Sequence, residues 1–222
     1  MNFLSRIFSI KKVPYLSWSS EHPLNKRPKA FTVIMLVIGL FLFGLGEAIL
    51  IASDSGVSPW TVLAQGISKM TNVSIGEATF LISISILLFW IPLRQIPGIG
   101  TILNVIIIAS AIDLTLPYLP HPENFLLKIL QASLGILVVG IGSGIYLSCN
   151  LGPGPRDGLM VGLQQITNKS IPIIRTFIEL SAVISGWLLG GIVGVGTILF
   201  VFGIGPCVGM GLTLVEKLSR EA

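Results

Sequence analysis

The sequence has few charged residues, few cysteines and few histidines for its length. Asp, Glu, Lys and Arg make up 11% of its 222 residues, whereas 52% are hydrophobic; a soluble domain usually carries about 25% charged residues. The two cysteines and two histidines form no zinc-ligand spacing and no disulfide framework. The chain also lacks a GxxxxGK[ST] motif, the phosphate-binding loop of many ATPases. This composition predicts an integral membrane protein with no metal and no cofactor.

Six apolar runs are long enough to span a membrane, because a spanning helix needs roughly 20 apolar residues. The fifth and sixth runs are joined only by the segment LGGIVG, so a count of five spans with one broken helix stays open. We therefore expect an all-α, polytopic transmembrane helix bundle in the lipid bilayer. The expected spans are residues 30–52, 75–93, 98–118, 125–148, 171–190 and 194–214.

Basic residues gather on one side of this expected bundle. Six of them precede the first span, and the connections after the second and fourth spans hold Arg94, Arg156 and Lys169. The connections on the other side hold only Lys69 and Lys128. Since cytoplasmic loops are enriched in Lys and Arg, both termini are expected in the cytoplasm. The basic N-terminal arm suits an anionic leaflet, and nothing else in the chain suggests nucleic-acid binding.

The second half of the chain repeats the first at an offset of 96 residues, without a gap. Ordered matches of Gly, Pro, Thr and Asn carry this similarity, because chance pairing of apolar residues does not produce them. Three spans per half is an odd number, so the halves should form two inverted three-span repeats, as in many secondary transporters. The matches include Gly56 with Gly152, Pro59 with Pro155, TNVSI (71–75) with TNKSI (167–171), and GIGTIL (98–103) with GVGTIL (194–199).

Each half contains a Gly/Pro-rich turn followed by a segment too short to cross the membrane. The turns are DSGVSPWTVLAQG (54–66) and NLGPGPRDGLMVG (150–162). A helix of ten residues is about 15 Å long, so each short helix either lies along the interface or dips into the bilayer. The expected parts are a basic cytoplasmic arm (1–29), repeat 1 (30–118), an extracytoplasmic linker (119–124), repeat 2 (125–214) and a cytoplasmic tail (215–222).

The strings GPGPRDGL and, one repeat earlier, GVSPW resemble the YczE/YyaS/YitT group of bacterial integral membrane proteins. The likeness covers roughly residues 30–214. It implies a location in the bacterial inner membrane and supplies no substrate. Members of the group have Gly-Pro-Trp-Asp in the first repeat, whereas this chain has SPWT, with Thr61 in the acidic position.

Several residues at the two turns are candidates for solute binding or gating. Asp157 and its repeat mate Thr61 are both good N-caps, and we expect them to start the short helices. Arg156 stands where the first half has Trp60, which follows Pro59. Either Arg156 snorkels and Trp60 is an interfacial belt residue, or the pair gates or orients a solute. Convergence of Trp60 and Arg156 on one central cavity would favour transport, and separation on outer surfaces would disfavour it.

Three further ionisable residues lie within the expected spans, where such groups are candidates for function. Glu47 is in the middle of the first span, so it must pair across helices, line a wet cavity or be protonated. Arg175 and Glu179 are four residues apart and share a helix face, although Arg175 is close enough to the edge to snorkel. The candidate site residues are Glu47, Pro59, Trp60, Arg156, Asp157, Arg175 and Glu179.

Two functional hypotheses remain. The first is a small secondary transporter or permease for an unknown solute or ion, in which the intramembrane charges couple protons or ions. The second is a non-transporting assembly or accessory protein of another membrane complex. Either role is compatible with a homo-oligomer or a membrane partner. An enzyme is not expected, because the spans hold no His and no paired-Asp motif.

Overall fold

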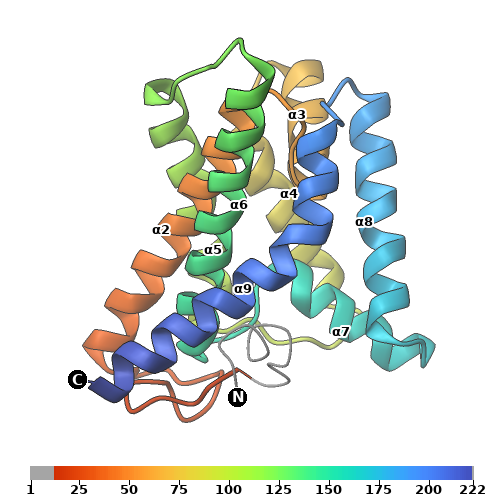
Figure 1. Cartoon of the computed structure of the whole chain (residues 1–222). Helices are drawn as coiled ribbons and strands as arrows, with labels where there is room; N and C mark the ends of the chain where they lie inside the picture. Colours follow the sequence, from red (N-terminus) through yellow and green to blue (C-terminus); the bar gives the residue numbers. More distant parts are fainter. Residues whose placement is uncertain (1–12, 222) are drawn as a thin grey trace.

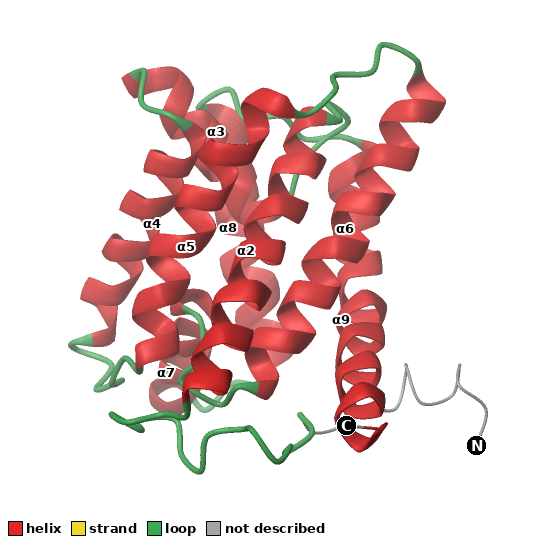
Figure 2. Ribbon diagram, turned by 90° about the vertical axis from the view of Figure 1, so that its left-hand side faces the viewer, coloured by secondary structure: helices red, strands yellow, loops and turns green. Residues whose placement is uncertain are grey.

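A computed structural model describes residues 13–221 as a bundle of helices, with no strand in that range (Figures 1 and 2). The basic residues Arg6, Lys11 and Lys12 of the N-terminal arm lie outside the described residues. The elements are α2 (Ala30–Ala52), α3 (Pro59–Thr71), α4 (Ile75–Trp90), α5 (Ile99–Thr115), the 3₁₀ turn η1 (Leu116–Tyr118), α6 (Phe125–Ser148), α7 (Pro155–Thr167), α8 (Ile171–Leu188) and α9 (Val195–Glu221).

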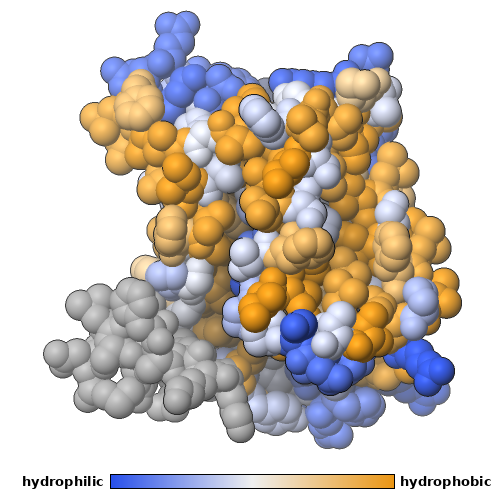
Figure 3. Space-filling view, turned by 90° about the vertical axis from the view of Figure 1, so that its right-hand side faces the viewer, coloured by the Kyte–Doolittle hydropathy of each residue, from blue (hydrophilic) through white to orange (hydrophobic). Residues whose placement is uncertain are grey.

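Five of these helices are long and apolar enough to cross a membrane: α2, α5, α6, α8 and α9. Helix α4 has 16 residues and makes a sixth candidate together with α3, from which it is bent by 113°. The alternative of one helix broken between the fifth and sixth runs is wrong, since α8 and α9 each qualify as separate spans. On the face shown in Figure 3, apolar side chains form a belt between more polar ends.

Glycines allow the helices at the centre of the bundle to pack closely. A Cβ added to Gly46 of α2 would lie 2.5 Å from the backbone nitrogen of Val139 in α6, and one added to Gly142 would lie 2.6 Å from the carbonyl oxygen of Gly39. No side chain fits into such a contact, and small residues permit this approach between membrane helices. The glycines of α2 and α6 therefore serve close helix packing.

Equivalent elements recur in the two halves at the offset of 96 residues. Helices α3 and α7 both begin at a proline and end at a threonine, and an asparagine in the left-handed conformation follows each. The φ angles are 57° at Asn72 and 54° at Asn168, and 108° at Gly56 and 112° at Gly152 in the preceding turns. The Gly and Asn matches in the sequence thus mark positions where the backbone needs a residue that tolerates positive φ.

The start of α5 docks on the turn of the second half, and the start of α9 docks on the turn of the first. The backbone N–H of Gly100 donates to the carbonyl of Leu151 at 2.7 Å, and that of Gly196 donates to the carbonyl of Ser55 at 2.8 Å. The two donors, Gly100 and Gly196, are 96 residues apart, and so are the two acceptors, Ser55 and Leu151. Each half therefore supplies the hydrogen bond that holds the other half's turn.

The described part of the N-terminal arm is tied to the turn that precedes α7. The hydroxyl of Ser19 donates to the carbonyl of Ser148 at 2.6 Å, and the side chain of Asn150 donates to the carbonyl of Ser20 at 2.8 Å. At the other terminus, the expected tail at 215–222 is not a separate segment, because α9 continues to Glu221. Helix α2 starts and α9 ends at the same end of the bundle (Figure 1).

Candidate functional site

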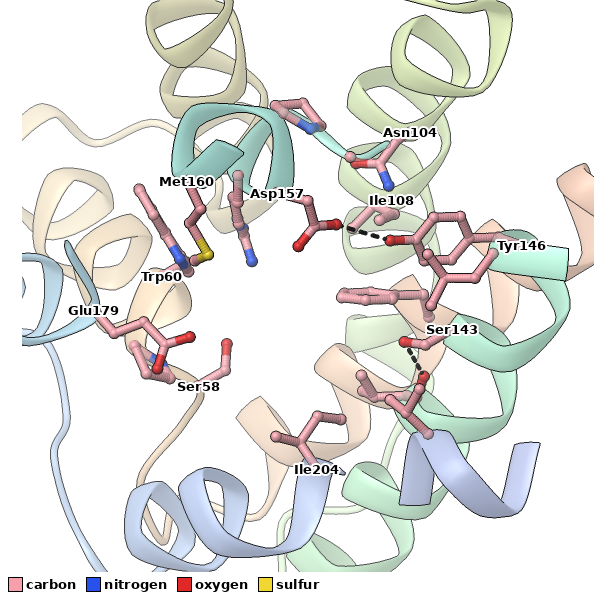
Figure 4. Close-up of a pocket in the computed structure, with 18 of the residues that line it drawn as sticks. Ser58, Trp60, Asn104, Ile108, Ser143, Tyr146, Asp157, Met160, Glu179 and Ile204 are labelled. Atoms are coloured by element: carbon pink, nitrogen blue, oxygen red, sulfur yellow. Dashed lines mark hydrogen bonds between the residues drawn. The ribbon is translucent and has the colours of Figure 1, made fainter. Parts of the chain in front are cut away.

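A cavity of about 330 Å³ lies between the two halves of the chain. The short helices α3 and α7 both border it with their first residues, and α2, α4, α5, α6, α8 and α9 supply the rest of the wall. Its lining is mixed: the charged side chains come from α7 and α8, and the other helices supply both apolar side chains and uncharged polar ones such as Asn104, Ser143 and Tyr146 (Figure 4). The apolar part consists of Phe43, Ile108, Val139, Phe200, Ile204 and Val208.

The N-termini of the two short helices meet at this cavity, but the expected capping residues are wrong. Ser58 is the N-cap of α3 and Gly154 is the N-cap of α7, and neither helix has a side-chain cap. Thr61 and Asp157 lie three residues further on, in the first turn. The prolines at the first helical position set φ for the helix, so the helix starts earlier than the polar residue. This leaves Thr61 and Asp157 available for contacts across the bundle.

Arg156 and Trp60 lie against each other beside the cavity. The guanidinium carbon of Arg156 is 5.2 Å from the centroid of the Trp60 indole, which is within the range of a cation–π interaction. Both side chains line the cavity, and Trp60 is buried. Trp60 and Arg156 thus converge on one cavity and do not lie on separate outer surfaces.

Glu47 lies behind the start of α3, with 2% of its surface exposed. Its Oε2 is 2.9 Å from the Ser58 hydroxyl and 2.8 Å from the Thr61 hydroxyl, which donate to it. Its Oε1 is buried and has no hydrogen-bond partner among the described residues. The positive charge of Arg156 interacts with Glu47 electrostatically. Of the possibilities that the sequence left open for Glu47, the structure shows pairing across helices, from α2 to the start of α3.

Asp157 faces Tyr146 of α6 across the cavity (Figure 4). The Tyr146 hydroxyl donates to Asp157 Oδ2 at 3.1 Å. The Asp157 side chain is otherwise exposed where it lines the cavity. The carboxyl group of Asp157 lies in the first turn of α7, where a helix favours negative charge.

Arg175 and Glu179 form an ion pair on α8, with Arg175 Nε 2.8 Å from Glu179 Oε1. Both line the cavity, and 52% of the Arg175 side chain and 21% of the Glu179 side chain are exposed. Pairing lowers the cost of placing both charges in an apolar span. Arg156, by contrast, makes no hydrogen bond or ion pair within residues 13–221, although Glu47 and Asp157 act on its charge.

The cavity is not closed by helix packing between α8 and α9. Helix α4 packs closely on α5, whereas the equivalent α8 and α9 are not a closely packed pair. Figures 1 and 2 both show α8 standing apart from the lower part of α9. Gly205 of α9 borders the cavity here, and a Cβ added to it would meet no atom within 4 Å.

The structure thus gathers six of the seven sequence candidates in the cavity wall, and the seventh, Glu47, directly behind it. It also adds residues that the sequence analysis did not single out. Asn104 in the third span is a polar residue in an apolar run, a pattern that marks functional candidates. Tyr146 and Ser58 carried no such pattern, and Ser143 is notable only as the repeat mate of Glu47. Within the described chain, no group of three His, Cys, Asp or Glu residues could hold a metal ion.

Comparison with known proteins places this architecture among bacterial membrane proteins. An uncharacterised protein of Haemophilus influenzae is 40% identical over 211 residues, which are 95% of this chain and 96% of the relative. The uncharacterised membrane protein YczE of Bacillus subtilis is 32% identical over 72% of this chain and 76% of its own length. YyaS of the same organism is 27% identical over 81% of this chain and 92% of its own length.

No solved structure matches the chain. Residues 30–212 match the model of a family of unknown function, DUF6198. This range holds all of the cavity lining and both short helices. The chain is therefore a multi-pass membrane protein that belongs to the DUF6198 family, with YczE and YyaS among its relatives.

Proposed function

We propose that the protein is a small secondary transporter whose solute site is the cavity between the two halves. The observation that carries the proposal is the meeting of Trp60 and Arg156, the equivalent residues of two short helices, at one cavity. Interrupted spans whose helix ends face a common site are a recurring feature of secondary transporters. The proposal involves no enzymatic step and no cofactor.

Inverted repeats are part of this proposal, and three observations support them. The short helices have equivalent bounds, the left-handed residues coincide, and the two hydrogen bonds from Gly100 and Gly196 are reciprocal. Two similar halves that exchange contacts can rock against each other around a fixed site. In this mechanism, the contact of α9 with the turn at Ser55 and that of α5 with the turn at Leu151 would open alternately on opposite sides of the site.

The intramembrane charges have separate roles in this mechanism. Glu47 holds the start of α3 through Ser58 and Thr61 and balances the charge of Arg156. Arg156 and Asp157 face the solute, and the Arg175–Glu179 pair lines the unpacked side near α9. Glu47 is also our candidate for coupling to protons or ions, because one of its oxygens is buried and has no hydrogen-bond partner among residues 13–221.

The proposed sidedness is that of a bacterial inner-membrane protein with both termini in the cytoplasm. The common end of α2 and α9 supports it (Figure 1), as does the enrichment of basic residues in the loops at that end. Green fluorescent protein fused to the C-terminus should fluoresce, and alkaline phosphatase fused there should be inactive. The reverse result would overturn this orientation.

Flux through purified protein tests the transport proposal. The full chain in liposomes should take up at least one member of a broad panel of labelled metabolites and ions. Glu47→Gln and Arg156→Gln should reduce that flux by about 10-fold or more, in line with losses at buried charged contacts. Glu123→Gln, at an exposed loop position, is the matched control and should leave the flux unchanged.

The accessory role predicts a different result. The protein would then show neither flux nor solute binding, and it would co-purify with one dominant stoichiometric membrane partner. Its cellular function would also survive Glu47→Gln and Arg175→Gln. These results together would overturn the transport proposal.

A further inference from the structure

The chemistry of the cavity wall limits the solutes that can occupy it. The wall contains two positive side chains, Arg156 and Arg175, and two negative ones, Asp157 and Glu179. A lone anion would be repelled by the carboxylates, and a lone cation would be repelled by Arg156. A solute that carries both charges meets a favourable partner for each.

Arg156 is the available partner for an anionic group. The Arg175 guanidinium is already paired with Glu179, whereas Arg156 lies over the ring face of Trp60 and makes no hydrogen bond or ion pair within the described chain, although the charges of Glu47 and Asp157 act on it. Its hydrogen-bond donors therefore remain for a ligand, and a guanidinium binds a carboxylate with two parallel hydrogen bonds. The uncapped starts of α3 and α7 border the same cavity and add partial positive charge.

Asp157 is the available partner for a cationic group. Glu179 is paired with Arg175, and Glu47 is held by two hydroxyls behind the wall. Asp157 accepts a hydrogen bond from Tyr146 and interacts with the backbone of Gly154, and its second oxygen makes no side-chain hydrogen bond in the described structure. A carboxylate can accept several hydrogen bonds, so an ammonium group can bind beside the tyrosine.

The rest of the cavity wall favours an apolar body of limited size. Phe200, Ile204 and Val208 of α9 line it together with Phe43, Ile108 and Val139, beside a few uncharged polar side chains such as Asn104 and Ser143. The volume of about 330 Å³ is at the lower end of the range of about 300–1,000 Å³ for small-molecule sites. An apolar group of a few carbons beside the charged groups would bury this wall and gain hydrophobic free energy.

We infer that the cavity binds a small zwitterion with an apolar body, of the chemical class of the aliphatic and aromatic α-amino acids. Arg156 binds the carboxylate, Asp157 binds the ammonium group, and the wall of α9 receives the apolar side chain. This inference names the substrate class of the proposed transporter, and its binding part can be tested without transport.

Binding by the purified full chain in detergent tests the inference through the unfolding midpoint Tm. Leucine, methionine and phenylalanine are the zwitterionic probes. The compound 3-methylbutylamine lacks the carboxylate of leucine, 4-methylpentanoate lacks its ammonium group, and glycine lacks its side chain. At about 100 times its Kd, a binding zwitterion should raise Tm by about 5–10 °C. The three partial probes should bind at least about 10-fold more weakly than leucine, because each loses one contact.

Substitutions of Arg156 and Asp157 test which of them binds the carboxylate of the ligand and which binds its ammonium group. Arg156→Gln should lower the affinity for the zwitterion about 10- to 100-fold and leave that for the amine within about 2-fold, since the amine has no carboxylate. Asp157→Asn should likewise lower the affinity for the zwitterion about 10- to 100-fold and leave that for 4-methylpentanoate within about 2-fold, since this acid has no ammonium group. Arg156→Lys keeps the charge without the bidentate geometry, so its affinity for the zwitterion should lie between those of the wild type and Arg156→Gln. Arg94→Gln and Asp54→Asn, both exposed and outside the cavity, are the controls.

The inference is overturned if none of the three amino acids raises Tm, or if the acid or the amine alone binds as tightly as leucine. Equal loss of every probe in Arg156→Gln would also overturn it. Binding of leucine without its uptake into liposomes would leave the substrate class intact and overturn the transport proposal. Flux of a different solute with no amino-acid binding would overturn the substrate class and leave the transport proposal intact.

Discussion

The guanidinium of Arg156 lies over the indole ring of Trp60, 5.2 Å from its centroid, although the two residues are 96 positions apart in the chain. They occupy the same position in α3 and α7, directly after the proline that begins each helix. Their contact joins the starts of two short helices that come from different halves of the molecule. It also fixes the only uncommitted guanidinium of the cavity wall in the described structure.

Replacing Trp60 should weaken both the fold and the site. Trp60→Leu removes a buried ring and the cation–π contact, so we expect the free energy of unfolding to fall by about 1–3 kcal/mol. Trp60→Phe keeps a ring and should lie between the wild type and Trp60→Leu. Thermal unfolding in detergent measures the order. Trp187→Leu, on the exposed face of α8, is the control, and an equal loss there would contradict the role of the stacked pair.

Gly158 is required because α7 packs directly on Trp90 of α4. A Cβ at Gly158 would lie 2.0 Å from a ring carbon of Trp90, while the indole N–H donates to the carbonyl of Pro155 at 3.0 Å. Gly158→Ala should therefore cost about 1–3 kcal/mol through overpacking. The combination with Trp90→Leu should cost less than the sum of the two single changes.

Additive effects in that double-mutant cycle would show that the ring and the glycine do not interact. Gly203→Ala provides the control for a glycine in a helix, since the nearest atom to its added Cβ is 3.5 Å away. It should leave stability unchanged or raise it by about 0.5–1 kcal/mol, because alanine favours the helix.

The two reciprocal docking contacts should respond equally to mutation. A Cβ at Gly98 would lie 2.3 Å from the carbonyl oxygen of Leu151, and one at Gly194 would lie 2.4 Å from that of Ser55. Gly98→Ala and Gly194→Ala should each lower the unfolding free energy by about 1–3 kcal/mol, because backbone must move to relieve the clash. Gly203→Ala, with its nearest atom at 3.5 Å, should be tolerated. A large difference between the first two variants would argue against equivalent halves.

The left-handed asparagines that end α3 and α7 give a second pair of matched positions. Asn72 and Asn168 have φ angles of 57° and 54°, a conformation that costs most side chains roughly 1–2 kcal/mol and glycine almost nothing. We expect Asn→Ala to destabilise at both positions by about 1 kcal/mol, and Asn→Gly to be close to neutral. Circular dichroism melts would measure this, and an alanine variant as stable as the glycine variant would contradict it.

The sequence predicts the helices well because hydrophobic length and turn chemistry act locally. The expected spans at 30–52 and 125–148 coincide with α2 and α6, and the expected Gly/Pro-rich turns contain Gly56 and Gly152, which both have positive φ. The helix starts were misplaced by three residues at Asp157 and Thr61. Capping preference is weaker there than the fixed φ of the proline at the first helical position.

What the sequence alone determined is the membrane-spanning composition, the family likeness, the 96-residue repetition and the set of charged residues within apolar runs. Only the tertiary structure decided that these charges share one cavity. That arrangement depends on how α3 and α7 fold back into the bundle, and on glycine contacts such as Gly46 with Val139 that set the helix spacing. The partners of a charge in an apolar span come from other helices. Tyr146 for Asp157 and Trp60 for Arg156 were therefore beyond the reach of local sequence patterns.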